Sequence, residues 1–181
     1  MRITQLSVDF SAENDRLRLR IATQDGAELR FWLTRRYVRL LWPALLQLAE
    51  VASPVVQQQA AREGGAAAPI SPEARKAIVE MEHQEAVQKA DFSKPFAPSG
   101  SATPLGEEPL LLARVQGGRG PDGKPVLGLH TQDGRGLTLN LDAMLLHAMM
   151  RLVHQAAAQA QWDLALALPA PQPPPPSGPL N

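Results

Sequence analysis

Residues 16–34 read RLRLRIATQDGAELRFWLT, and residues 124–142 read KPVLGLHTQDGRGLTLNLD. The tetrapeptide Thr-Gln-Asp-Gly stands at 23–26 in the first stretch and at 131–134 in the second. The apolar residues on both sides of it keep the same spacing in the two stretches, without a gap. A register shared over a strand, a turn, a strand and the start of a helix is typical of a repeated structural unit. The sequence therefore predicts two copies of one supersecondary unit.

Apolar and polar residues alternate on both sides of the tetrapeptide, which is the period of a half-buried strand. Placing every apolar residue of the first stretch on one face pairs position 21 with 29, 19 with 31 and 17 with 33. This register leaves 24–26 as a three-residue loop, in which Gly26 takes the left-handed position. A two-residue Asp-Gly turn would instead place Arg20 opposite Phe31 on the buried face. The same three-residue loop is expected at 132–134.

Each hairpin leads directly into a predicted helix. Thr34 and Asp142 occupy equivalent positions, and both are good N-cap residues. Pro43 lies inside the first helix and should bend or break it, and Ser53-Pro54 marks its expected end. Apolar residues at helical spacing form one stripe in each helix: Val38, Leu41, Trp42, Leu45 and Leu48 in the first, and Leu146, Met149, Met150 and Val153 in the second.

These elements predict an α+β protein built from a duplicated β-β-β-α unit, with antiparallel sheet or sheets packed against two long helices. The first unit covers residues 1–53 and begins with a strand at 3–10. The second unit covers 110–168 and begins with a strand at 110–116. Residues 54–109 form a linker between the units, and residues 169–181 form a proline-rich tail that we expect to be disordered.

The linker is predicted to contain one helix, at about 71–89. Ser71, Pro72 and Glu73 provide an N-cap, a proline in the first turn and an acidic residue in the first turn. Its apolar stripe is thin and consists of Ala74, Ile78 and Met81. Residues 92–108 carry several prolines with glycine and serine and are expected to be extended and mobile. The helix, the proline tail or both are candidate contact points for a partner.

The composition limits the function classes. The formal net charge is zero, so the whole-chain balance does not indicate a strongly basic nucleic-acid binder. The absence of cysteine excludes disulfides, thiolate metal sites and cysteine nucleophiles. We expect no signal peptide, because residues 1–10 alternate polar and apolar, and no apolar stretch is long enough for a membrane span. Frequent alanine, proline, glycine and arginine favour a bacterial, cytoplasmic protein.

The first hairpin and helix carry a basic face with an aromatic residue. Such a face can neutralise phosphates and stack on bases, which is what single-stranded nucleic acid requires. A solvated arginine face, with the tryptophan covered by another part of the protein, is the competing interpretation. The second unit has mostly uncharged residues at the equivalent strand positions, so the first unit alone would provide the charge. The candidate binding residues are Arg16, Arg18, Arg20, Arg30, Trp32, Arg35, Arg36 and Arg39.

At the level of architecture only, a duplicated strand-hairpin-helix unit resembles the Pur and Whirly nucleic-acid-binding families. Those families use repeats of strands followed by a helix, with four strands in each unit where this sequence predicts three. The chain shares no motif residues with them. The resemblance implies a possible fold and a nucleic-acid partner, and it assigns no individual residue.

Pairs of titratable residues at helical spacing do not complete a predicted metal site. Glu80 and His83 have the spacing found in di-iron carboxylate bundles, but those need two such pairs, so a solvated helix face is favoured. His147 and His154 lie two turns apart, too far to chelate one metal by themselves. We expect no metal, no cofactor and no catalytic residues.

The sequence thus favours a non-enzymatic bacterial protein-interaction module, with an unknown protein or a second copy of the chain as its partner and no membrane association. The alternative is a single-stranded nucleic-acid-binding protein that uses the basic face of the first hairpin. An enzyme has the least support, because no nucleophile, base and orienting group occur together.

Overall fold

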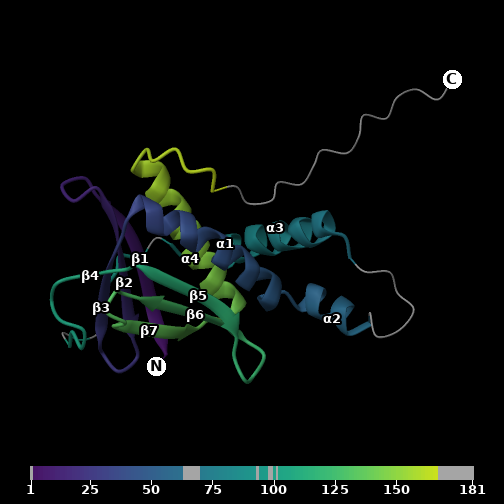
Figure 1. Cartoon of the computed structure of the whole chain (residues 1–181). Helices are drawn as coiled ribbons and strands as arrows, with labels where there is room; N and C mark the ends of the chain where they lie inside the picture. The colour runs from purple at the N-terminus through teal and green to yellow at the C-terminus, as the bar shows by residue number, and fades with distance from the viewer. Residues whose placement is uncertain (1, 63–69, 93, 98–99, 101, 167–181) are drawn as a thin grey trace.

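The computed structural model describes residues 2–62, 70–92, 94–97, 100 and 102–166. The predicted tail at 169–181 lies outside these residues. The described part has an α+β fold with two sheets (Figure 1). The first sheet contains, in spatial order, β1 (Ile3–Ser11), β2 (Arg16–Thr23), β3 (Glu28–Leu33) and β4 (Leu110–Leu111). The second contains β5 (Arg114–Arg119), β6 (Pro125–His130) and β7 (Gly136–Asn140). The helices are α1 (Arg35–Ala52), α2 (Pro54–Arg62), α3 (Pro72–Lys89) and α4 (Ala143–Gln159).

The register predicted for both hairpins is confirmed. In the first, position 17 pairs with 33, 19 with 31 and 21 with 29. In the second, 127 pairs with 139 and 129 with 137. Thr23 and Thr131 close the loops through backbone bonds of 3.0 Å to Ala27 and 2.7 Å to Arg135. The register is fixed because a slip by one residue would move every apolar side chain of the strand to the opposite face.

The strand predicted at 110–116 is wrong as a single element. Leu110 and Leu111 form β4, which runs parallel to β3 and closes the first sheet. The chain then changes sheets, because the Leu112 amide donates to the Trp32 carbonyl at 3.0 Å and the Ala113 amide donates to the His130 carbonyl at 2.9 Å. Leu112 is buried at this crossing and joins the core. The first sheet is therefore mixed.

The helix starts are positioned by the predicted caps. The Thr34 hydroxyl accepts from the Tyr37 amide at 3.1 Å, and the Asp142 carboxylate accepts from the Leu145 amide at 2.8 Å. The apolar stripes predicted for α1 and α4 are buried. Helix α1 continues through Pro43 and ends at Ala52, so the proline does not break it.

The prediction of two long helices is incomplete, because α3 has 18 residues, as many as α1, and α4 has 17. The helices that follow the two hairpins each pack mainly on the sheet of the other hairpin. Helix α1 follows β3 but packs mainly on β5 and β6 of the second sheet, and α4 follows β7 but packs on β1 of the first. Figure 1 shows these helices crossing each other beside the sheets. Tyr37 connects α1 to the second sheet, because its buried hydroxyl donates to the Arg114 carbonyl at 3.1 Å. Burial also raises the pKa of this hydroxyl above its usual range. One continuous core joins both sheets.

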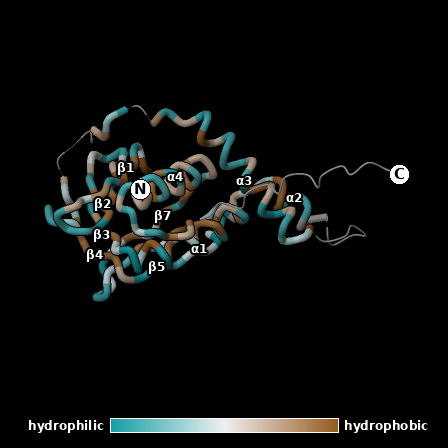
Figure 2. The backbone as a smooth tube through the Cα atoms, turned by 90° about the horizontal axis from the view of Figure 1, so that it is seen from above, coloured by the Kyte–Doolittle hydropathy of each residue, from teal (hydrophilic) through white to brown (hydrophobic). Residues whose placement is uncertain are grey.

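The segment predicted as a linker, residues 54–109, contains two helices where one was predicted. Helix α2 begins directly after α1 and lies to one side of the sheets (Figures 1 and 2). Helix α3 spans Pro72–Lys89 with Ser71 as its N-cap and packs mainly on α4. Among the described residues, no helix is both long and apolar enough to cross a membrane.

Candidate functional site

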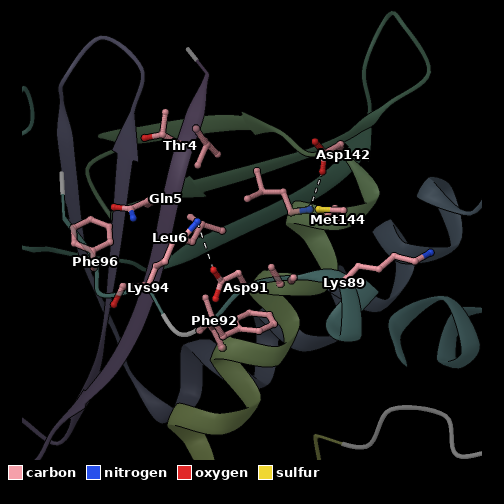
Figure 3. A pocket seen from close by; sticks show the side chains of 16 residues that line it. Thr4, Gln5, Leu6, Lys89, Asp91, Phe92, Lys94, Phe96, Asp142 and Met144 are labelled. Atoms are coloured by element: carbon pink, nitrogen blue, oxygen red, sulfur yellow. Dashed lines mark hydrogen bonds and ion pairs between the residues drawn. The ribbon is translucent and has the colours of Figure 1, made fainter. Parts of the chain in front are cut away.

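A groove runs beside β1, the terminal strand of the first sheet. One edge of β1 pairs with β2 along its length, and no strand pairs with the opposite edge in the part of the chain that the structure describes. An edge of this kind presents a row of backbone N–H and C=O groups that can pair with another strand. Helix α4 packs against the buried face of β1, so the groove lies between this edge and the start of α4 (Figure 3).

The groove has a volume of about 520 Å³ and an apolar floor. Ile3 and Leu6 of β1 line it together with Leu145 and Leu152 of α4, and the exposed Met144 also lines it. Met144 is 53% exposed although it is a large apolar residue. A concave site of this size with an apolar floor and a few polar groups is typical of binding sites.

A short segment after α3 closes the third side of the groove. We call it the strap and define it as residues 90–92 and 94–97. The strap passes around the edge of β1, because Phe92 contacts the Arg151 guanidinium of α4 at 4.7 Å and Phe96 contacts the Arg20 guanidinium on the other face of the sheet at 4.4 Å. Figure 3 shows the two rings on opposite sides of β1. The Ala97 amide also donates to the Gln5 side chain at 2.9 Å.

The charges around the groove compensate one another. Lys94 lies 3.5 Å from Asp91, and Lys89 lies 3.4 Å from Glu85. Asp142 is already engaged as the N-cap of α4. The groove therefore combines an apolar floor with the edge of β1, which has no strand partner among the described residues and is crossed by the strap. The described lysines at the groove each lie beside an acidic side chain.

The structure divides the predicted basic face into two parts. On the outer face of the first sheet, Arg18 and Arg20 both reach Asp9 of β1, at 2.9 Å and 3.5 Å. Arg30 lies 2.8 Å from the buried Glu28, and its guanidinium holds the pKa of that carboxyl below the usual range. These three arginines are therefore engaged by acidic side chains, which the strand pattern alone did not indicate. Trp32 is half-buried on the same face.

The remaining predicted residues have no such partners. Arg35, Arg36 and Arg39 are exposed near the start of α1, and none of them forms an ion pair within the described ranges. Arg16 is half-buried at the start of β2 and forms no ion pair with the described residues either. The first turn of α1 contains no acidic residue. Among the described residues, the part of the predicted basic face without ion pairs thus lies on α1 and at the start of β2.

The buried face of α3 differs from the predicted stripe. Met81 is 54% exposed, whereas Val79, Glu80 and His83 are buried. The prediction of a solvated Glu80–His83 face is therefore wrong. His83 meets His147 of α4, with the two Nδ1 atoms 3.2 Å apart. No cluster of three or more potential metal ligands is found within the described residues.

Sequence reasoning missed the groove because its walls come from three distant segments: 3–7, 89–96 and 142–152. The one local signal was the strand pattern of residues 3–10, which cannot show that β1 is an edge strand. A scan against protein-family models, a search of curated proteins and a search of solved structures each find no match to this chain.

Proposed function

We propose that this protein is a non-enzymatic interaction module whose groove receives an extended, largely apolar segment of a partner protein. The observation that carries the proposal is the edge of β1, which lacks a strand partner within the described residues and borders an apolar groove. Addition of a strand to an open edge supplies affinity through backbone hydrogen bonds and specificity through pockets for alternate side chains.

The chemistry of the groove favours a neutral occupant. An extended segment beside Ile3 and Gln5 would point every second side chain to the floor formed with Leu145 and Leu152. The lysines around the groove pair with Asp91 and Glu85, so they add little net positive charge that would favour an acidic side chain. An alternating apolar and polar segment meets both conditions.

A lysine in place of Met144 tests the groove. Short random peptides displayed on phage are selected on the purified protein, and the affinity of an enriched peptide is measured by fluorescence anisotropy. We expect the Met144→Lys variant to lose about tenfold or more in affinity, because a charge at the apolar rim opposes burial of the peptide. Leu40→Lys is the matched control, since Leu40 is a similarly exposed apolar helix residue, 49% exposed, outside the groove.

The selection also distinguishes other occupants. Equal affinity of the enriched peptide for the Met144→Lys variant and the Leu40→Lys control would contradict the proposal. Concentration-dependent self-association that Met144→Lys abolishes would identify a second copy of this chain as the occupant and overturn the choice of a separate protein. Enrichment of acidic peptides whose binding requires Arg35 and Arg39 would contradict the proposal and favour a binding site on α1.

The alternative function is binding of single-stranded nucleic acid, and the free arginines of α1 favour it. It predicts saturable binding of single-stranded DNA or RNA in an anisotropy titration, with affinity that falls steeply as salt increases. We expect the Arg35→Glu/Arg39→Glu variant to weaken this binding about tenfold or more, and Arg18→Glu to weaken it less, because Arg18 is paired with Asp9. Trp32→Ala measures the stacking contribution. Absence of binding at low salt would contradict this alternative.

We also infer that the two hairpin-helix halves derive from one duplicated unit. The support is the identical loop sequence, the equal strand register and the equivalent caps Thr34 and Asp142. Diverged copies would explain why one half provides the open edge of β1 and the other provides α4 as the opposite wall of the groove.

A further inference from the structure

A pair of buried histidines fastens α3 to α4. His83 is 6% exposed and His147 is 2% exposed. Their Nδ1 atoms are 3.2 Å apart, and the ring centroids are 5.3 Å apart with the planes at 66°. At this separation one Nδ1 donates a proton and the other accepts it, so the contact requires at least one unprotonated imidazole nitrogen.

The apolar part of the same interface is small. Among the described residues of α3, three are buried, and Val79 is the apolar one. The other two are Glu80 and His83. The histidine contact and the hydrogen bond from the Ser53 hydroxyl to the Glu82 carboxylate at 2.9 Å add polar contacts that hold this helix in place. The strap follows directly, because α3 ends at Lys89 and Ala90 is its C-cap. Docking of α3 thus positions Lys89, Ala90 and Phe92 in the wall of the groove.

We propose that protonation of the His83–His147 pair undocks α3, displaces the strap and so dismantles the groove in acid. The consequence for partner binding rests on the function proposed above, whereas the undocking itself does not. The first proton leaves a hydrogen bond between the rings but places a charge in a buried site. The second proton makes both Nδ1 atoms donors, and the contact is then repulsive.

The groups that face the pair determine the direction of the effect. Burial is the largest influence on the pKa of His83 and lowers it; Arg151 and His154 of α4 lower it further, while Glu80 opposes them. Glu80 accepts from Gln84 through one carboxylate oxygen, and its other oxygen has no hydrogen-bond partner among the described residues. Burial lowers the pKa of His147 to about 4, and His83 adds to this.

Both imidazoles thus bind protons less readily when α3 is docked than when it is released. Docking is at full strength above the ordinary histidine pKa of about 6.5 and weakens as the pH falls below it. The loss continues until the pH reaches the depressed pKa of about 4 for His147. A neutral pair is therefore the docked state.

Distance measurements between spin labels test the proposal on the full chain. The protein has no cysteine, so introduced cysteines are labelled selectively. Gln88→Cys with Gln155→Cys reports the distance between α3 and α4, and Lys94→Cys with Met144→Cys reports the width of the groove. Between about pH 7.5 and about pH 4.5, we expect both distance distributions to change from narrow to broad and long.

The control replaces both histidines by apolar residues, His83→Phe/His147→Leu, and should keep narrow distributions at both pH values. Unchanged distances in the original protein, or an equal response in the double variant, would overturn the proposal. If the double variant does not fold, hydrogen exchange of the original protein decides. After correction for intrinsic rates, the exchange protection of the α3 amides should fall at least about tenfold in acid, while the protection of the α1 amides stays constant. An equal change in the protection of both helices would overturn the proposal. Neither readout needs a partner, so each is independent of the proposed binding function.

Discussion

Replacing Gly136 by alanine should destabilise the protein by about 3 kcal/mol or more. Gly136 begins β7 with φ of +149°, and a β-carbon there would lie 2.0 Å from the Leu129 carbonyl oxygen and 2.8 Å from the His130 Cα. Both atoms belong to the paired strand β6, so the hairpin would have to open. The free energy of unfolding, measured by urea denaturation, checks this result.

Two other glycines provide the scale for that measurement. Gly118→Ala should change stability by less than about 0.5 kcal/mol, because a β-carbon there meets nothing within 4 Å. Gly134→Ala should cost about 1 kcal/mol, because its φ of +88° is unfavourable for alanine although the surrounding space is open. A Gly136→Ala variant as stable as Gly118→Ala would contradict the hairpin geometry.

Replacing Trp162 by alanine should cost about 3 to 5 kcal/mol. The side chain is 4% exposed, packs edge to face on Phe10 of β1 at 6.2 Å and donates its indole N–H to Asp15 at 3.0 Å. These contacts fasten the segment after α4 to the β1–β2 hairpin. Trp162→Phe keeps most of the ring contact and removes the hydrogen bond, so we expect it to cost about 1 kcal/mol. Equal unfolding free energies for the alanine variant and the original protein would exclude this contact from the folded state.

The hairpins and the helix caps could be predicted from the sequence because the information is local. Alternation around the Thr-Gln-Asp-Gly loops fixes which face each strand buries, and burial of that face fixes the register. Thr34 and Asp142 satisfy amides only three residues further along the chain. Such features need no knowledge of the rest of the molecule.

The features that could not be predicted from the sequence depend on contacts between segments that are distant in the chain. Nothing in residues 110–116 indicates that the chain leaves the first sheet at Leu112, because the two acceptor carbonyls belong to Trp32 and His130. The neutralisation of Arg18 and Arg20 depends on Asp9 of a neighbouring strand. The tertiary structure determines that these carbonyl groups and the Asp9 carboxylate become the partners.

The candidate site shows the same division. The basic residues of the first hairpin were identifiable as a group, but the sequence could not separate the paired arginines of the sheet from the free arginines of α1. Helix α3 has a weak apolar pattern, so its buried face could not be assigned. His83 is buried and contacts His147 of α4, a partner 64 positions away in the sequence. The groove itself exists only where β1, the strap and α4 meet.

Whether the groove binds peptide can be tested by a nuclear magnetic resonance titration of the ¹⁵N-labelled protein with the peptide enriched by phage selection. We expect chemical-shift changes concentrated at residues 3–7, at the described residues of 89–96 and at 142–152, the three segments that line the groove. We expect the Met144→Lys variant to show none of these changes at the same peptide concentration. Changes concentrated instead at Arg35 to Arg39, or on the second sheet, would contradict the assignment of the groove as the binding site.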